Sequence, residues 1–256
     1  MSRNIIDKIK SLIFMVTFFL VSCSKDIEKL PVNEQAIYLP SRFSDDIPRD
    51  RNRKPLDVLN FSTIQPGMTV VDLLGGGGYY SELFNHIVGE KGKVYLQNNS
   101  LFLRFSSEEL EQRLANNRLK NVVRLDSEFA DMQLPEQVDM IFLGLSFHDL
   151  YVKRDDPVIT ADRDQVYAQL KAALKPGGKI ILIDHAAEPG TGISKTKKNH
   201  RIDEDWVKQD MASEGFVFVD SIDVLRNPND DRTLDIWKGK VRNKTDRFIH
   251  MYLKPE

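Results

Sequence analysis

The sequence has 256 residues, of which 41% are hydrophobic, enough for one substantial α/β core or two small ones. Its 36 lysines and arginines nearly balance 38 aspartates and glutamates, so the formal net charge is −2. Because both signs are dispersed, the sequence lacks the basic patch that is typical of a nucleic-acid-binding protein. The single cysteine, Cys23, excludes a disulfide within the chain.

The first 22 residues differ in composition from the rest of the chain. Three basic residues, Arg3, Lys8 and Lys10, precede an apolar run from Ser11 to Ser22. This run is too short to cross a bilayer comfortably. A basic start followed by a short apolar run is typical of a secretory signal peptide.

The run ends in Leu-Val-Ser-Cys, which resembles a bacterial lipobox, the motif whose cysteine is lipidated before the preceding peptide is removed. The resemblance implies a lipoprotein signal peptide over residues 1–22 and lipidation of Cys23. The protein would then be exported and membrane-anchored. Ser24 is not the aspartate that often retains lipoproteins at the inner membrane, which favours the periplasmic side of the outer membrane. The alternative is a short buried helix with a free thiol.

Residues 23–53 are polar and rich in Pro, Asp and Arg, without a sustained period. This composition predicts a tether followed by an extended N-terminal arm. From residue 54 onward, apolar patterns typical of helices and strands alternate. In chain order they predict a helix at 55–61, a strand at 69–74, a helix at 80–88, a strand at 93–97, a helix opened by a capping box of Ser106 and Glu109, strands at 121–125 and 138–145, a helix at 163–174, a strand at 179–184, a helix at 204–215, and strands at 216–225 and 247–254.

Strands that alternate with helices imply a mainly parallel sheet covered on both faces. The last two predicted strands lie close in the sequence, without room for a long helix between them, which indicates an antiparallel pair at one edge. We therefore expect residues 54–256 to form a single α/β domain. Its fold would be Rossmann-like, a doubly wound, mainly parallel seven-stranded sheet with an antiparallel edge pair.

Four consecutive glycines follow the first predicted strand: Gly75, Gly76, Gly77 and Gly78. In a doubly wound sheet, ligands bind beyond the carboxyl ends of the strands, where glycines let a ligand approach the backbone. The run is not a P-loop, because no lysine follows it. It fits a dinucleotide fingerprint poorly, because Ser81 stands where the third glycine is needed. A purely structural turn is the alternative.

Asp72, Gly76 and Gly78 resemble the first motif of the class I S-adenosylmethionine-dependent methyltransferases. Leu74 stands where that family usually has its first glycine. Residues 174–184 resemble the family's stretch leading into strand five. Further blocks between Arg49 and Pro255, among them FHDLY and HRID, look like a group of bacterial predicted methyltransferases, many of them exported.

The resemblance implies S-adenosylmethionine as the cofactor. Asp72 and the loop of Gly75, Gly76, Gly77 and Gly78 would then line its methionine end, with Tyr79 as a candidate cover. Asn98 stands where an acid normally grips the ribose hydroxyls, and an uncharged amide makes a weaker hydrogen bond there. Glu128 stands where an acid or amide often meets the adenine. Leu74 and Asn98 predict weak cofactor binding or an altered ligand.

Three of the five histidines fall at the same predicted sheet edge. His148 and Asp149 follow the fourth strand, Asp184 and His185 end the fifth, and His200 comes soon after. Methyl transfer needs in-line positioning, and it needs a base only when the acceptor loses a proton. We take His148, Asp149 and His185 as the catalytic candidates, with His148 first, although each histidine alone is also consistent with a structural role.

The segment after the fourth strand lacks the Asn/Asp-Pro-Pro-Tyr element of many amino-group methyltransferases that act on nucleic acids or glutamine. This favours a small-molecule methyl acceptor and no nucleic-acid partner. The leading hypothesis is an exported, lipid-anchored methyltransferase, although S-adenosylmethionine is made in the cytoplasm. The alternatives are a catalytically degenerate ligand-binding lipoprotein and a metal-assisted hydrolase using the His/Asp rim. This rim contains no close pair of ligand residues at helical spacing, so the sequence does not predict a metal site. The methyl acceptor and the oligomeric state do not follow from the sequence.

Overall fold

The computed structural model describes residues 26–256; the predicted signal peptide and Cys23 lie outside the described residues. Seven strands form one sheet in the order β3-β2-β1-β4-β5-β7-β6. Strands β1 to β5 pair in parallel, and β7 runs antiparallel to both β5 and β6. The predicted doubly wound sheet with an antiparallel edge pair is therefore confirmed. The strands are β1 (Thr69–Leu73), β2 (Lys93–Asn98), β3 (Val122–Asp126), β4 (Val138–Gly144), β5 (Leu174–His185), β6 (Val217–Ser221) and β7 (Arg247–Leu253).

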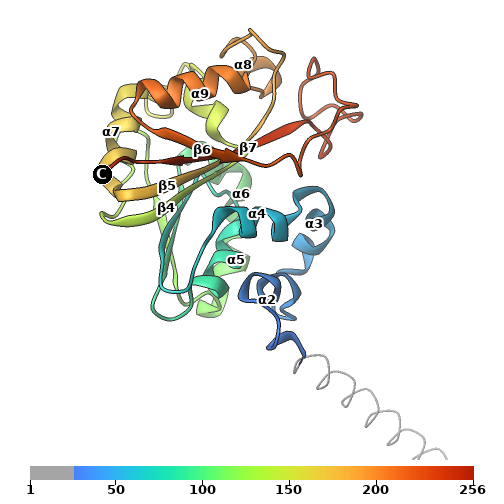
Figure 1. Ribbon diagram of the computed structural model, residues 1–256, viewed down its shortest axis with the longest axis vertical. Helices are drawn as coiled ribbons and strands as arrows, with labels where there is room; N and C mark the ends of the chain where they lie inside the picture. The colour runs from blue at the N-terminus through green and yellow to red at the C-terminus, as the bar shows by residue number, and fades with distance from the viewer. Residues whose placement is uncertain (1–25) are drawn as a thin grey trace, which may run out of the picture.

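Helices cover both faces of this sheet (Figure 1). Helices α2, α4 and α5 pack on one face, and α7 and α9 pack on the other. No helix within residues 26–256 is long and apolar enough to span a bilayer. The helices are α2 (Val32–Tyr38), η1 (Ser44–Asp46), α3 (Ile47–Arg53), α4 (Pro55–Ser62), α5 (Tyr79–Val88), α6 (Ser100–Leu114), η2 (Ala115–Asn117), η3 (Phe147–Tyr151), α7 (Arg163–Ala173), α8 (Thr196–Asn199) and α9 (Glu204–Ser213).

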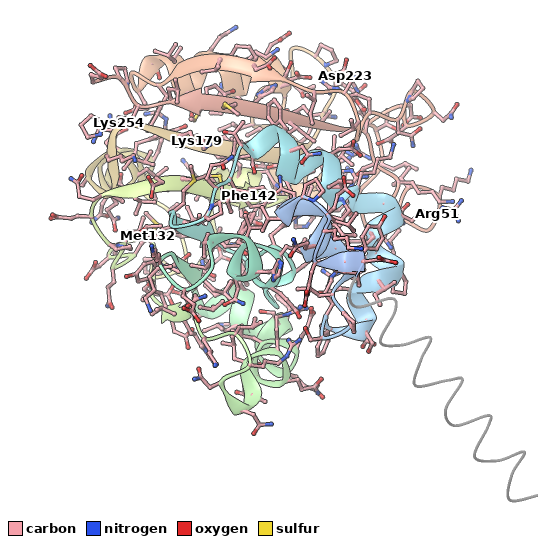
Figure 2. All side chains as sticks on the ribbon, turned by 60° about the horizontal axis from the view of Figure 1, so that its bottom comes forward. Arg51, Met132, Phe142, Lys179, Asp223 and Lys254 are labelled. Atoms are coloured by element: carbon pink, nitrogen blue, oxygen red, sulfur yellow. The ribbon has the colours of Figure 1, made fainter. Side chains whose placement is uncertain are left out.

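The central strands are buried on both faces because their side chains alternate between two hydrophobic cores. On β1, Val70 packs in the core under α4 and α5, and Val71 packs in the core under α7 and α9. Phe142 of β4 is fully buried against the rings of Tyr80 and Phe84, and Figure 2 shows it inside the molecule. This packing fixes the carboxyl ends of β1 and β4, where the strand order reverses.

The start of α6 differs from the prediction. The helix begins at Ser100, not after Ser106, because the Asn99 side chain accepts a hydrogen bond from the Phe102 N–H and caps the helix there. Ser106 lies inside the helix, and its hydroxyl donates to the Phe102 carbonyl. The predicted capping box was therefore wrong, and α6 starts directly at the end of β2.

The predicted extended arm was also wrong from Val32 onward. This segment folds into α2, η1 and α3, and it packs against the start of α5. Its attachment is largely polar: the Tyr79 hydroxyl donates to Asp50 at 2.6 Å, and Arg42 pairs with the same carboxylate at 2.6 Å. Because charged and polar side chains attach this segment, it lacks the apolar residues at helical spacing from which a helix is predicted. The sequence pattern therefore did not reveal these short helices.

Candidate functional site

The candidate site lies at the carboxyl ends of β1 and β4, the switch point of the sheet. Two leucines adopt left-handed backbone conformations there, Leu74 after β1 with φ of +53° and Leu145 after β4 with φ of +70°. Such conformations are strained for residues with bulky side chains, and strain of this kind concentrates at functional sites. Leu74 is buried in the hydrophobic core that also contains Phe129 and Phe147, so its side chain packs against protein.

The glycine loop is held to β2 by Asn98. The Gly76 N–H donates to Asn98 Oδ1 at 2.8 Å, and Asn98 Nδ2 donates to the Gly76 carbonyl at 2.9 Å. Asn98 is fully buried, so its carboxamide is committed to the loop. The structure therefore places Asn98 as a clamp on Gly76, where the sequence led us to expect a ribose contact.

Three of the four glycines lie tightly against neighbouring protein atoms. A Cβ on Gly75 would lie 2.7 Å from the Asp72 carboxylate, and one on Gly77 would meet the carboxylate of Glu109. A Cβ on Gly78 would lie 3.0 Å from the Arg113 side chain. Close packing of α5, α6 and the loop thus explains these glycines without a ligand.

Gly76 differs from its three neighbours. It has φ of +58°, and a Cβ built there would meet no atom within 4 Å. The backbone at this position is therefore bare and faces open space. Among the loop residues, Gly76 is the one whose surroundings fit an approaching ligand.

Asp72 lies fully buried beneath the loop. Ser81 Oγ donates to its carboxylate at 2.6 Å. Burial nevertheless raises the pKa of Asp72 to about 6, although the hydrogen bonds from Ser81 and the charges of Arg53 and Arg113 oppose the shift. The carboxylate therefore carries an uncompensated desolvation cost, which a cation bound above it would reduce.

Two buried polar atoms without partners lie at the neighbouring strand ends, among the residues that the structure describes. The Asn99 side chain uses Oδ1 to cap α6, which leaves Nδ2 unpaired. Glu128 after β3 accepts the Ser100 N–H at 3.0 Å through Oε1, which leaves Oε2 unpaired. A free amide donor and a free carboxylate oxygen suit the hydroxyl and amino groups of a nucleoside. The residues present therefore fit the cofactor that the sequence predicted, with Asn99 in place of Asn98.

Tyr79 does not face this open space. Its ring lies under the guanidinium groups of Arg49 and Arg53, and its hydroxyl is bound to Asp50. The N-terminal segment is thus stacked over the first turn of α5, and Tyr79 anchors that segment. The sequence led us to expect Tyr79 to cover the cofactor, but in the structure its side chain contacts the N-terminal segment.

A buried ion-pair network joins the N-terminal segment to the glycine loop. Arg113 of α6 is fully buried, pairs with Asp46, Glu82 and Glu109, and donates through Nε to the Gly77 carbonyl. Buried charges must be paired to be tolerated. The network therefore fixes the loop from its outer side.

The histidines form a second part of the site, next to the glycine loop in the sheet order. His148 lies on η3, directly after β4. Its Nδ1 lies 2.9 Å from Asp184 Oδ1, and its backbone N–H donates to Asp184 Oδ2 at 2.7 Å. Its Nε2 lies 3.6 Å from Asp149 Oδ2. Burial alone would lower the pKa of His148, but Asp184 and Asp149 outweigh it and raise that pKa to about 9.

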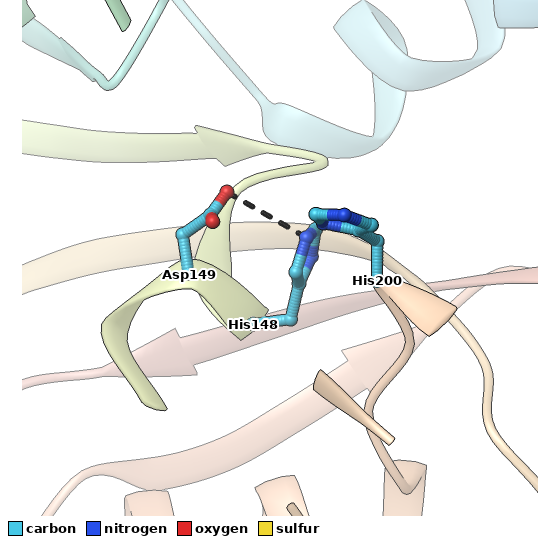
Figure 3. Close-up of side chains that lie close together, drawn as sticks. All are labelled: His148, Asp149 and His200. Carbon is cyan, nitrogen blue, oxygen red and sulfur yellow. Dashed lines mark ion pairs between the residues drawn. The ribbon is translucent and has the colours of Figure 1, made fainter. Parts of the chain in front are cut away.

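The other two rim histidines lie close to His148. The His185 ring is 6.2 Å from the His148 ring, centroid to centroid, and its Nδ1 lies 2.6 Å from the Thr245 hydroxyl. Burial and neighbouring cations, His148 first, lower the pKa of His185. His200 stands edge-on to His148 with centroids 5.5 Å apart (Figure 3). The structure thus brings the three predicted rim histidines, His148, His185 and His200, together with Asp149.

Sequence reasoning missed three contributors to the site. Asn99 gave a visible signal, since an asparagine directly after a strand and before a helix is a common N-cap. Arg113 and Arg53 gave none, because each contacts the site only through segments distant in the sequence. Arg53 is largely buried, and no carboxylate pairs with it in the described part of the chain.

A cavity of about 300 Å³ lies beside this site, between the end of α3 and the segments that flank β6 and β7. Five of its lining residues are cationic, namely Arg51, Lys54, Arg226, Lys244 and Arg247. Arg247 is the first residue of β7 and pairs in register with His185. The cavity is therefore separate from the glycine loop but adjacent to the histidine rim.

Comparison with known proteins agrees with this fold. No family model matches the sequence. The ubiquinone/menaquinone biosynthesis C-methyltransferase UbiE of Shewanella piezotolerans is 30% identical over 122 residues, which are 47% of this chain and 43% of that protein. The UbiE protein of Shewanella oneidensis is 27% identical over 128 residues, 49% of this chain and 46% of that protein. The chain thus spans under half the length of these relatives.

Solved structures match over most of the chain. A methyltransferase from Aquifex aeolicus that depends on S-adenosylmethionine has a TM-score of 0.54 at 24% identity, covering 83% of this chain and 100% of that one. The geranyl diphosphate C-methyltransferase from Streptomyces coelicolor has a TM-score of 0.51 at 14% identity, covering 88% of each chain. At these identities the structures establish the fold, while the narrower resemblance to exported proteins stays a prediction. The chain thus has the fold of the class I S-adenosylmethionine-dependent methyltransferases, and about half of it is similar in sequence to UbiE C-methyltransferases.

Proposed function

We propose that the protein is an S-adenosylmethionine-dependent methyltransferase that acts on a small molecule. The observation that carries this proposal is that the carboxyl ends of β1, β2 and β3 are followed by the bare backbone of Gly76 and by two buried polar groups without a partner in the described chain. These groups, Asn99 Nδ2 and Glu128 Oε2, are a hydrogen-bond donor and a hydrogen-bond acceptor at the strand ends where ligands bind in a doubly wound sheet.

The chain's own residues would divide the work between two halves of the site. Gly76, Asn99 and Glu128 would hold the nucleoside, and the buried Asp72 would favour the cationic methionine end of the cofactor. The bound cofactor supplies an electrophilic methyl group on sulfur. His148 and Asp149 on η3 and His185 at the end of β5 would position the acceptor beside that methyl group. Positioning is the main requirement of such a transfer.

A small acceptor is supported by the relatives and by the surface chemistry. The UbiE relatives are named for ubiquinone and menaquinone biosynthesis, and the Streptomyces enzyme for geranyl diphosphate. Both names describe small molecules. The dispersed charge argues against nucleic acid as the acceptor, and so does the lack of an Asn/Asp-Pro-Pro-Tyr element after β4.

Calorimetric titration with S-adenosylmethionine tests the donor half, with two matched variants. Gly76→Asn adds a side chain in the open space at the carboxyl end of β1, and asparagine tolerates the left-handed backbone. Gly67→Asn makes the same change at the opposite end of β1, where φ is +85° and a Cβ also meets no atom. We expect binding to be lost in Gly76→Asn and retained in Gly67→Asn.

Two outcomes would contradict the proposal. If the folded wild type binds no S-adenosylmethionine, the degenerate ligand-binding protein becomes the better account. If both glycine variants bind as well as the wild type does, a cofactor would have to lie away from the glycine loop.

Export and lipid anchoring are part of the proposal and rest on the sequence of residues 1–23. Cys23 would carry the lipid, and the domain would act at the membrane surface outside the cytoplasm. In a bacterial host, Cys23→Ser should move the protein from the membrane fraction to the soluble fraction. Membrane association that persists in Cys23→Ser would rule out the lipid anchor.

A further inference from the structure

The side chains of His148, Asp149 and His200 converge beside the proposed acceptor position. One ligand atom from each lies within 4.8 Å of those of the other two. They come from two elements, since His148 and Asp149 lie on η3 and His200 is the C-cap of α8 (Figure 3). This spacing lets a single ion contact all three side chains.

The ring of His148 is already oriented for such a contact. Asp184 accepts the Nδ1 hydrogen and is itself fixed by the backbone N–H groups of His148 and His185, both at 2.7 Å. This leaves Nε2 facing Asp149. In metal centres, a carboxylate that binds the far nitrogen of a ligand histidine typically sets its tautomer and orientation in this way.

The other two groups also keep a ligand atom free. Arg154 binds Asp149 Oδ1 at 2.7 Å, so Oδ2 remains available toward His148. His200 adopts a left-handed conformation with φ of +52°, and its ring lies between the rings of His148 and Trp237. Within the described residues, no hydrogen bond occupies either ring nitrogen of His200.

We propose that His148, Asp149 and His200 bind one divalent first-row transition metal ion, with Asp184 holding His148 in position. Two imidazoles and one carboxylate suit ions such as Zn²⁺, Fe²⁺ or Mn²⁺ and disfavour Mg²⁺ and Ca²⁺, which prefer oxygen ligands. Three protein ligands leave a coordination position open. An oxygen atom of the acceptor, or water, fits that position. Binding of the ion does not depend on the methyl-transfer proposal.

Titration of the full chain with ZnSO₄, followed by calorimetry, tests the site. The Cys23→Ser background removes the only thiol, which would otherwise bind zinc itself. We expect one Zn²⁺ per chain and a dissociation constant raised about tenfold or more in His200→Gln. His86→Gln is the matched control, because His86 is a half-buried histidine on α5, away from the cluster. Its affinity for Zn²⁺ should equal that of the parent.

A spectroscopic measurement keeps the test independent of calorimetric heats. Co²⁺ added to the same protein should give visible absorption typical of nitrogen and oxygen ligands, and His200→Gln should change that spectrum while circular dichroism shows that the variant is folded. Two results would overturn the proposal: absence of Zn²⁺ binding by the folded parent, or unchanged affinity in the folded double variant Asp149→Asn/His200→Gln. Either result leaves the S-adenosylmethionine titration unaffected, so the two proposals fail separately.

Discussion

Asp72 should lower the stability of the folded protein at neutral pH, and this cost can be measured. Burial raises the pKa of Asp72 from 3.8 to about 6, so the folded state favours the protonated acid. Below pH 3.8 the acid is protonated in both states and stability is fully retained. As the pH rises toward 6, the unfolded chain ionises first and stability is lost. The shift corresponds to about 3 kcal/mol above pH 6.

The variant Asp72→Asn removes the charge and keeps the shape of the side chain. Its carbonyl oxygen still accepts from the Ser81 hydroxyl, which now donates to Asp72 at 2.6 Å. The second carboxylate oxygen is lost as an acceptor, at a cost of about 1 kcal/mol. We therefore expect Asp72→Asn to be more stable than the wild type at pH 8 by about 2 kcal/mol and slightly less stable at pH 4.

Urea unfolding followed by the fluorescence of the two tryptophans, at pH 4, 6 and 8, measures this difference. Asp164→Asn is the control for loss of one negative charge, because Asp164 lies on the surface with its side chain 89% exposed. The reasoning is refuted if Asp72→Asn is less stable than the wild type by the same amount at every pH. That result would mean that Asp72 carries its charge in the fold without cost.

Three further predictions concern the network, the nucleoside edge and the core. Arg113→Met leaves buried carboxylates without their cation and should lower the free energy of unfolding by about 3–5 kcal/mol in urea titrations; a loss below about 1 kcal/mol would contradict the network. Glu128→Gln should weaken S-adenosylmethionine binding about tenfold in calorimetry, since a neutral acceptor replaces a charged one, whereas equal affinity would remove Glu128 from the site. Phe142→Ala should cost about 3–5 kcal/mol in the same unfolding assay, and a smaller loss would indicate that the strand core collapses around the cavity.

The fold followed from the sequence because its signals are local. Buried parallel strands are rich in β-branched residues, and helices α5, α7 and α9 carry apolar residues at helical spacing, so their positions were predictable within a few residues. The start of α6 was misplaced because Asn99 caps the helix from the end of β2, while Ser106 and Glu109 formed a plausible box inside it.

The site followed only in part, because burial and pairing depend on contacts across the chain. The sequence pointed to the glycine loop, Glu128 and the histidine rim. It could not show that Asn98 clamps Gly76, or that Tyr79 binds Asp50 under an arginine-rich segment. Those roles are set by residues more than 20 positions away, which no local pattern reports.

The central claim, a nucleoside held at the glycine loop, is tested most directly by photochemical cross-linking. Radiolabelled S-adenosylmethionine is irradiated with the folded protein, and the labelled peptides are identified by mass spectrometry. We predict label within residues 74–80, 98–102 or 127–129, and its loss when unlabelled S-adenosylhomocysteine competes. Label confined to the cationic cavity near Arg51 and Arg247, or label that the competitor does not remove, would contradict the account.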